Sequence, residues 1–304
     1  MNEPGVGARL LEEERNAVRF AGYDYSYRII HQDRPTTEPI VLLGGVLQDQ
    51  FAWTGVEQHL SAHASVITVD LPGAGDSDVL PAYHGFDFLA DALAHVLDDA
   101  GIPRANLFGA CYGAVTAGRF ICRHPARTVG AVLASVGPEL APQTRDSLHY
   151  ALDALVGGDP DEFVRTTVDL FFPPTAGESA QRKAITLLAY RNFNSLSPDG
   201  MDRYVQNTLR VLRHPLRPRE AIPADVRFLI VAGEHDRFAP PGLSRELAVE
   251  LPRADFAVIR DAGHLLSGER PEALADLIAN FTMGRSVDTA EYLATYESLD
   301  RLAG

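Results

Sequence analysis

The sequence NLFGACYGAVTA, residues 106–117, joins a short apolar run to a helical pattern through the turn Gly109-Ala110-Cys111-Tyr112-Gly113. Gly109 and Gly113 have no Cβ, so they permit a tight strand-to-helix turn that holds the residue between them in an exposed position. Cys111 then stands at the N-terminus of the helix, where the dipole and the free N–H groups favour a thiolate. The stretch predicts a strand, a sharp turn with a reactive cysteine, and a helix. The alternative is a small buried cysteine at a strand–helix junction.

Other short apolar runs lie on both sides of this turn. They are PIVLLGG (39–45), SVITVDLPGAG (65–75), ANLFGA (105–110), GAVLASVG (130–137), VRFLIVAG (226–233) and DFAVIR (255–260). Continuous runs of this length are typical of strands buried on both faces of a parallel sheet. Helical patterns separate them, at 85–100, 112–124, 241–250 and 270–282. We therefore expect an α/β fold, with a mostly parallel central sheet and helices on both faces.

The alternation stops between residues 139 and 219, where helical patterns occur without a strand-like run. We expect an all-helical cap at 139–219, inserted into an α/β core formed by residues 1–138 and 220–304.

The two ends of the chain carry further patterns. Residues 16–31 alternate polar and apolar side chains around Gly22 and predict a hairpin. In the tail, 288–302, large apolar side chains recur at helical spacing and predict a last helix packed on the core: Tyr292, Tyr296, Leu299 and Leu302.

The composition limits the partners and the compartment. The formal net charge is −14 at pH 7, and nucleic acids and anionic membranes both favour basic surfaces, so we expect neither as a partner. No apolar run reaches the ~18 residues of a membrane helix, and the N-terminus lacks a signal pattern, so we expect a cytoplasmic protein. Cys111 and Cys122 would lie about 16 Å apart on one helix, too far for a disulfide, which agrees with a reducing compartment.

Two loops offer the partners that a cysteine nucleophile needs. In VAGEHDRFAPP, Asp236 follows a buried strand by a few residues, where a carboxylate can reach the C-terminal edge of the sheet. Glu234 is the weaker candidate for the same position. In RDAGHLLSGERP, His264 follows the last strand in a short loop that contains glycine. The order along the chain is nucleophile, acid, histidine, so Cys111, Asp236 and His264 form a candidate catalytic triad.

With these motifs the chain resembles the α/β-hydrolase superfamily, in a form with a Cys-Asp-His triad, over residues 20–283. The segment DLPGAGDSD (70–78) is similar to the loop after the family's fourth strand, and LLGGVLQDQFAW (42–53) is similar to its oxyanion loop.

The resemblance implies an oxyanion hole formed by the backbone amides of Val46 and Tyr112. Many relatives carry His-Gly where this chain has Gly44-Gly45, so Leu47 is the alternative donor. Nothing in the sequence calls for a metal or another cofactor, and we expect none.

Two subgroups of the family share further features with the chain. Its layout, cap size and tail resemble enzymes that make or transfer 3-hydroxyacyl chains from acyl carrier protein. Its cysteine resembles the thioesterase-like Dieckmann cyclases, which release polyketide–amino-acid chains as tetramic acids or pyridones. Polyhydroxyalkanoate synthases and dienelactone hydrolases also use cysteine, but they are respectively longer and capless.

A cysteine thioester is nearly isoenergetic with a carrier thioester, and it favours carbon and amine nucleophiles over water. We hypothesise that Cys111 takes the acyl chain of a carrier-bound thioester. His264, oriented by Asp236, then removes an acidic proton of that chain, and the carbanion attacks the thioester and closes a ring. A hydrolytic thioesterase or a 3-hydroxyacyl-ACP acyltransferase with the same triad is the alternative. A non-catalytic binding module, and an engineered serine-to-cysteine replacement that traps an acyl-enzyme, are further alternatives.

The cap is rich in aromatic side chains, Phe163 among them, which either pack its own core or line a pocket for a long apolar acyl chain. The candidate pocket residues are Gly45, Leu47, Phe171, Phe172, Tyr190, Phe193 and Tyr204.

Five arginines cluster near the end of the cap: Arg203, Arg210, Arg213, Arg217 and Arg219. Because carrier domains are usually acidic, this cluster is the candidate docking patch for an acyl or peptidyl carrier protein, with a solvated helix face as the alternative.

Overall fold

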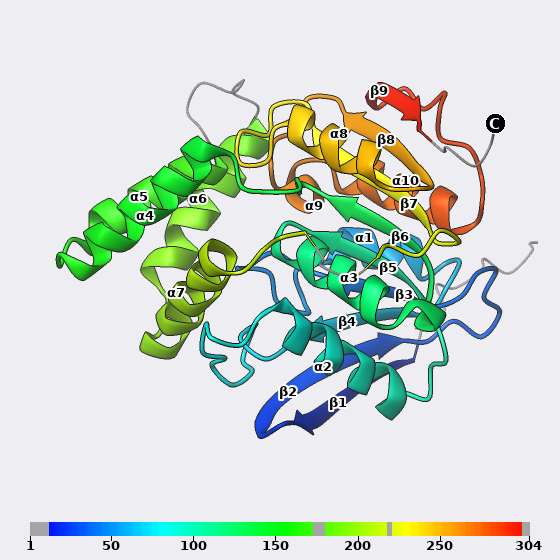
Figure 1. Cartoon of the computed structure of the whole chain (residues 1–304), viewed down its shortest axis with the longest axis horizontal. Helices are drawn as coiled ribbons and strands as arrows, with labels where there is room; N and C mark the ends of the chain where they lie inside the picture. The colour runs from blue at the N-terminus through cyan, green and yellow to red at the C-terminus, as the bar shows by residue number, and fades with distance from the viewer. Residues whose placement is uncertain (1–11, 173–179, 218–220, 300–304) are drawn as a thin grey trace, which may run out of the picture.

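The computed structural model describes residues 12–172, 180–217 and 221–299. The strands of these residues are β1 (Glu13–Phe20), β2 (Tyr23–Ile30), β3 (Ile40–Leu43), β4 (Val66–Asp70), β5 (Ala105–Ala110), β6 (Thr128–Ala134), β7 (Arg227–Gly233), β8 (Ala254–Ile259) and β9 (Leu293–Ser298). They form one sheet in the order β1-β2-β4-β3-β5-β6-β7-β8-β9 (Figure 1). Neighbours from β4 to β8 pair in parallel, whereas β1, β2 and β9 pair antiparallel at the two edges. The expected α/β fold with a mostly parallel sheet is confirmed.

Helices cover both faces of this sheet. On one face lie α2 (Phe86–Asp99), α3 (Tyr112–Arg123) and α8 (Pro241–Glu250), and on the other lie α1 (Thr54–Leu60) and α10 (Pro271–Thr282). Two single turns, a 3₁₀ turn at Pro125–Arg127 and α9 (Leu266–Glu269), complete the core. The sequence patterns predicted α2, α3, α8 and α10, and they missed α1 and the two single turns.

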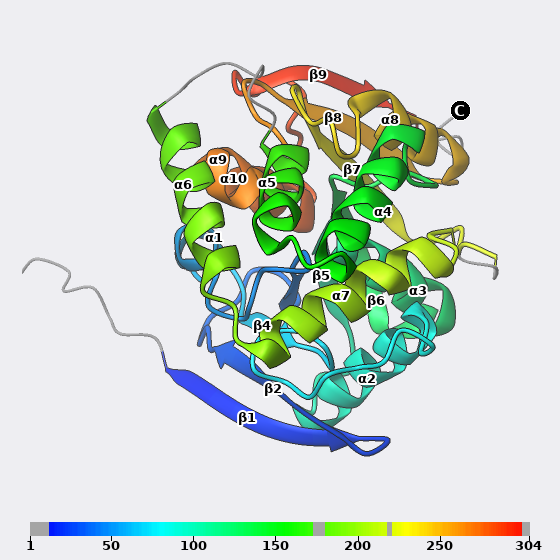
Figure 2. The ribbon, with the colours of Figure 1, turned by 90° about the vertical axis from the view of Figure 1, so that its left-hand side faces the viewer.

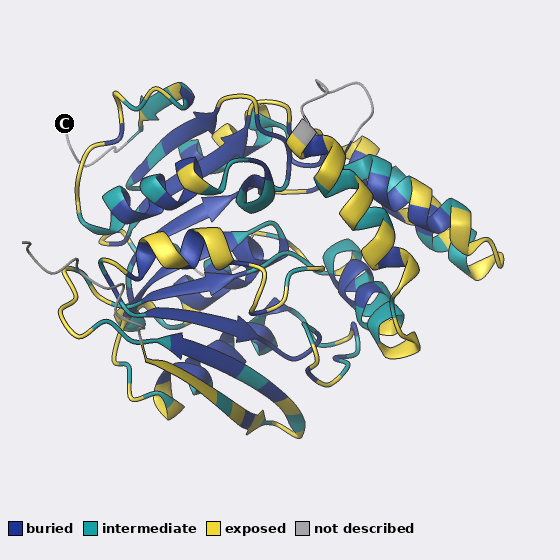
Figure 3. Cartoon of the chain, turned by 180° about the vertical axis from the view of Figure 1, so that it is seen from behind, coloured by how far each residue is buried: buried dark blue, intermediate teal, exposed yellow. Residues whose placement is uncertain are grey.

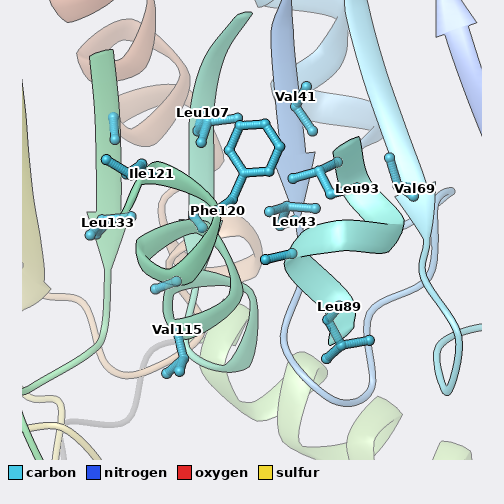
Figure 4. Packing of buried hydrophobic residues seen from close by; sticks show 14 of the residues in the cluster. Val41, Leu43, Val69, Leu89, Leu93, Leu107, Val115, Phe120, Ile121 and Leu133 are labelled. Atoms are coloured by element: carbon cyan, nitrogen blue, oxygen red, sulfur yellow. The ribbon is translucent and has the colours of Figure 1, made fainter. Parts of the chain in front are cut away.

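The strands divide the apolar core into two layers. Side chains of successive residues point to opposite faces of a strand, so Val41 and Leu43 pack toward α2 and α3, while Ile40 and Leu42 pack toward α1 and α10. Figure 4 shows the first layer, where Phe120 of α3 fills the space beside β3 and β5. Because both faces are covered, the central strands are buried along nearly their whole length (Figure 3).

Four helices between β6 and β7 form the cap: α4 (Pro142–Val156), α5 (Pro160–Phe171), α6 (Ala180–Asn194) and α7 (Pro198–Arg213). They lie together at one end of the molecule, on the left in Figure 1 and toward the viewer in Figure 2. The rings of Phe163, Phe193 and Tyr204 pack edge to face inside the cap and give it an apolar centre of its own. The helical insertion is thus part of the fold, and its boundaries as a separate domain, 139–219, stay a prediction.

The chain's two ends differ in how well the sequence predicted them. The hairpin at 16–31 is confirmed as β1 and β2, and its turn holds Ala21 and Gly22 at positive φ, as tight hairpins require. The helix expected at 288–302 is wrong within the described residues, because β9 pairs antiparallel with β8 there. An unpaired edge of β8 would leave backbone N–H and C=O groups without partners, and β9 satisfies them.

None of the helices in the described part of the chain is long and apolar enough to pass through a membrane.

Candidate active site

Cys111 lies between β5 and α3 in a strained backbone conformation, with φ 53° and ψ −112°. A non-glycine residue with positive φ persists only where its surroundings hold it. Its amide donates to the carbonyl of Ala134 at 2.9 Å. A Cβ on Gly109 would lie 2.6 Å from the Gly113 carbonyl oxygen, and one on Gly113 would lie 2.2 Å from the Leu43 carbonyl oxygen. Both glycines are therefore required by close approach, and together they fix the turn that presents the thiol.

His264 and Asp236 lie beside this turn, in the loops that follow β8 and β7. Nδ1 of His264 is 2.9 and 3.0 Å from the two carboxylate oxygens of Asp236. One of these oxygens also accepts the Ala239 amide at 2.9 Å, and the Asp236 side chain is fully buried. Since the carboxylate faces Nδ1, that nitrogen carries the proton of a neutral ring and Nε2 is left to act as the base.

The other imidazole nitrogen, Nε2, is buried and has no hydrogen-bond partner among the described residues. Burial lowers the pKa of His264, but the Asp236 carboxylate and the neighbouring Cys111 outweigh it and raise that pKa to about 10. The Asp236 carboxylate and Cys111 thus favour the charged form of the imidazole.

Two aromatic rings enclose the histidine. Phe171, at the end of α5, and Phe238, after β7, stack with centroids 5.0 Å apart. Their centroids lie 5.4 and 4.5 Å from that of His264. The pair restricts the imidazole and keeps water from one side of it, and Phe171 makes the cap part of the site.

Glu269, which no sequence pattern indicated, holds the loop that carries His264. Its carboxylate accepts the amides of Gly263 at 2.9 Å and Leu265 at 3.3 Å, the two residues that flank His264. Burial raises the pKa of Glu269, and Arg182 of α6 lies 3.8 Å from its carboxylate. A cap helix is therefore linked by charge to the loop that carries the histidine.

Gln48 holds the loop after β3, which is the candidate oxyanion loop. Its side-chain oxygen accepts the Gly45 amide at 2.9 Å, and its nitrogen donates to Ser267 Oγ, also at 2.9 Å. Val46 lines a cavity of about 40 Å³ together with Cys111 and Tyr112. Tyr112 is the first residue of α3, where a helix leaves N–H groups without an intrahelical acceptor.

The cavities favour Val46 over Leu47 as the candidate oxyanion donor. Val46 borders both Cys111 and Tyr112 in that small cavity, whereas Leu47 lines only the larger cavity described next and is 41% exposed.

A larger cavity, of about 410 Å³, is lined by both Cys111 and His264. Five of the candidate pocket residues line it: Gly45, Leu47, Phe171, Phe172 and Phe193. Tyr204 lines the smaller cavity instead. Tyr190 lines neither, and its hydroxyl donates to Asp169 at 3.3 Å. No lysine or arginine is among the described residues that line the larger cavity.

Glu234 is the weaker candidate for the acid. Glu234 is exposed and accepts the Asp261 amide at 2.9 Å, so the acid facing His264 is Asp236.

The arginine patch is wrong as a single surface, because Arg210 is fully buried. Arg203 is partly buried and donates to the Ser77 carbonyl, Arg217 pairs with Glu250, and Arg213 is exposed. Arg219 lies outside the described residues. Helix α7 is amphipathic, and Arg210 lies on its buried face together with Tyr204, Asn207 and Thr208.

The sequence profile of the α/β-hydrolase fold matches residues 38–271, from just before β3 to the start of α10. The chain belongs to the α/β-hydrolase family. It is therefore a hydrolase-fold enzyme, and its order of cysteine, aspartate and histidine is the family's order of nucleophile, acid and base.

Relatives within the family catalyse different reactions. The chain is 27% identical to a 2-hydroxy-6-oxononadienedioate/2-hydroxy-6-oxononatrienedioate hydrolase of Burkholderia vietnamiensis, over 84% of this chain and 90% of that one. It is 25% identical to an (R)-3-hydroxydecanoyl-ACP:CoA transacylase of Pseudomonas aeruginosa, over 78% of each chain. The crystal structure of an enol-lactonase from Burkholderia xenovorans superposes with a TM-score of 0.74 at 23% identity, covering 88% of this chain and 99% of that one. The structural likeness shows the fold of the α/β hydrolases.

Proposed function

We propose that this α/β hydrolase transfers an apolar acyl group through a thioester on Cys111, as a thioesterase or an acyltransferase. The observation that carries the proposal is the arrangement of His264. Its Nδ1 is held by Asp236, its Nε2 has no partner among the described residues, and Cys111 lines the same cavity. A histidine with one nitrogen oriented and the other available is the base of a nucleophilic triad.

Acylation begins with the Cys111 thiolate and protonated His264. The sulfur attacks the carbonyl carbon of the donor, and the carbonyl oxygen takes up the negative charge at the amides of Val46 and Tyr112. The tetrahedral intermediate collapses, the bond between the carbonyl carbon and the leaving group breaks, and His264 protonates the departing thiolate or alkoxide. Each backbone donor at such an oxygen contributes about 3–4 kcal/mol to the transition state.

Deacylation uses the neutral imidazole that the first step leaves. His264 takes a proton from water or from an acceptor hydroxyl or thiol, whose oxygen or sulfur attacks the Cys111 thioester. The bond between carbonyl carbon and Cys111 sulfur then breaks, and the thiolate and the imidazolium are restored. One relative named above is a hydrolase and another a transacylase, which supports transfer to water or to a second carrier.

The cavity favours an uncharged acyl group. Its cap side is formed mostly by apolar side chains, with Phe171, Phe193 and Leu188 among them, beside the polar Asn192. Asp49 is the acid that lines the cavity. A buried carboxylate needs a cation or several donors, and no lysine or arginine is found among the described lining residues. The apolar side chains on the cap side therefore favour a fatty or polyketide-like acyl chain over the dicarboxylic acid that names the Burkholderia vietnamiensis relative.

Ring closure is the second candidate, and the cysteine itself favours it. A thioester reacts readily with carbon nucleophiles, while water competes less well than it does for a serine ester. In this alternative, His264 deprotonates the carbon between a ketone and an amide of the bound chain, and that carbanion displaces Cys111. A carrier-protein thioester is the proposed donor in both candidates.

One experiment separates these outcomes. Wild type, Cys111→Ser and Cys111→Ala are incubated with the N-acetylcysteamine thioester of a β-ketoacyl-amino acid, and protein and products are followed by intact mass spectrometry. An acyl adduct on wild type, absent from Cys111→Ala, supports the proposal. Free acid then identifies a thioesterase, and a product at the mass of the acid minus one water identifies a cyclase. A wild type that forms no adduct and turns over no thioester would contradict both candidates.

A further inference from the structure

Arg210 is an arginine of the cap that is fully buried. Its Nη1 donates to Tyr112 Oη at 2.7 Å and to Asn207 Oδ1. Burying a guanidinium is unfavourable unless its N–H groups are satisfied. Its other donors reach three backbone carbonyls of the loop between β4 and α2: Leu80 at 2.7 Å, Pro81 at 3.0 Å and His84 at 2.7 Å.

The contact with Arg210 holds the hydroxyl end of the Tyr112 side chain. Its hydroxyl donates to Asn207 Oδ1 at 3.0 Å, and Asn207 in turn donates to the Gly73 carbonyl at 2.7 Å. The Tyr112 ring packs on Phe86, with centroids 5.1 Å apart. Burial raises the pKa of Tyr112 although Arg210 opposes it, so the phenol keeps its proton and donates it. We call Arg210, Asn207 and Tyr112 the Arg210 cluster.

The cluster connects two parts of the molecule whose relative position matters for the proposed mechanism. Arg210 and Asn207 belong to α7 of the cap, whereas Tyr112 follows Cys111 directly and begins α3. The amide of Tyr112 is one of the two proposed oxyanion donors. Such a donor acts only when it lies 2.7–3.1 Å from the developing oxyanion, so an error of a few tenths of an ångström already weakens it.

We infer that Arg210 is a positioning residue for acyl transfer, which acts through the Tyr112 side chain to hold the oxyanion donor beside Cys111 while it fixes the cap over the site. The inference rests on the proposed function, because it takes Tyr112 as an oxyanion donor. It adds a part of the cap to the acylation machinery without any contact between that part and the substrate.

Two reactions of the Cys111 thiol distinguish a misplaced oxyanion donor from a general loss of structure at the site. Acylation of Cys111 by a thioester or an ester passes through an oxyanion and needs the Tyr112 amide. Alkylation of Cys111 by iodoacetamide is a direct displacement at carbon, so it needs the thiolate and His264 but no oxyanion hole. A variant with a misplaced oxyanion donor loses the first rate and keeps the second.

The test compares Arg210→Met and Tyr112→Phe with wild type, using butyryl-N-acetylcysteamine and p-nitrophenyl butyrate as acyl donors. We expect acylation to fall about 10- to 100-fold in both variants, since misplacing one donor loses part of the 10²–10³-fold effect of removing it. Iodoacetamide should alkylate both variants within about threefold of the wild-type rate. Tyr112→Phe removes a single oxygen, so it stays informative if Arg210→Met does not fold.

Arg119→Met is the matched control. Arg119 is also a buried arginine that ties the end of the cap to the core, through the Pro215 carbonyl at 2.8 Å, and it belongs to α3. We expect this variant to keep both rates near wild type whatever its melting temperature.

Three results would overturn the inference. The first is a Tyr112→Phe variant that is acylated at the wild-type rate. The second is an acylation rate and an alkylation rate that fall by the same factor in both test variants. The third is an Arg119→Met variant that loses acylation but not alkylation to the same extent as the test variants. A wild type that the ester acylates and the thioester does not would contradict the proposed donor, and the comparison of variants would still be made on the ester.

Discussion

Replacing Gly113 by alanine tests the turn that presents Cys111. A Cβ there would lie 2.2 Å from the Leu43 carbonyl oxygen, 2.5 Å from its carbon and 2.7 Å from the Gly44 carbonyl oxygen. Ordinary contacts between carbon and backbone atoms are about 3.5 Å, so α3 and the end of β3 must separate by about 1 Å. All three atoms belong to the backbone, which cannot give way by rotating a side chain.

Overpacking of this kind lowers the free energy of unfolding by about 3 kcal/mol. The higher helix propensity of alanine than of glycine raises it by about 1 kcal/mol. The expected net loss is about 2 kcal/mol of unfolding free energy. The displaced segment leads directly to Val46, so we also expect acylation to fall about 100-fold, as it does when reacting groups move by 1 Å.

Gly118→Ala is the control on the same helix. A Cβ on Gly118 would meet no atom within 4 Å, so this variant should gain up to about 1 kcal/mol and keep its acylation rate. Urea unfolding followed by circular dichroism gives the two free energies, and intact mass spectrometry gives the rates. The reasoning is refuted if Gly113→Ala is as stable as Gly118→Ala and is acylated at the wild-type rate.

Three further predictions concern the site. Cys111→Ala should lower acyl transfer by about 1,000-fold or more, measured as product formation, and residual activity near wild type would show that the thiol is not the nucleophile. The pKa of His264, about 10, lies above the ordinary 6.5. The protonated ring therefore stabilises the fold fully below pH 6.5, and this contribution is lost as the pH rises through about 10. Melting temperatures from pH 6 to 10.5 should fall less steeply in His264→Gln than in wild type, and parallel curves would contradict the shift. Leu188 lines the larger cavity and is 53% exposed, whereas Leu187 is 70% exposed and does not line it. Leu188→Trp should lower turnover of decanoyl relative to butyryl thioesters about 10-fold, Leu187→Trp should leave the ratio unchanged, and equal ratios in the two variants would remove Leu188 from the acyl site.

Much of the core could be predicted because its signals are local. A buried parallel strand is a continuous apolar run, and each of the six runs overlaps one of the central strands. The spacing of Gly109 and Gly113 around Cys111 indicated the turn, since only glycine allows backbone to approach that closely. Asp236 and His264 were found from their places after strands, because the carboxyl ends of parallel strands meet at one edge.

What the sequence did not show depends on contacts between distant segments. The tail has a spacing that suits a helix, yet the free edge of β8 makes it a strand, and that edge exists only in the folded sheet. Arg210 looked like a surface charge, and its burial follows from carbonyls more than 120 residues earlier in the chain. Glu269 gave no signal either, because the amides that it accepts become its partners only when the histidine loop closes.

The triad comes from the ends of three different strands, β5, β7 and β8, and His264 follows Cys111 by 153 residues. A ribosome making about 5–20 residues each second finishes the cysteine about 8–30 s before the histidine. During that interval the thiol has no imidazole beside it to hold its negative charge. The candidate triad is therefore complete only after the strands that carry its three residues have all been made and have paired in one sheet.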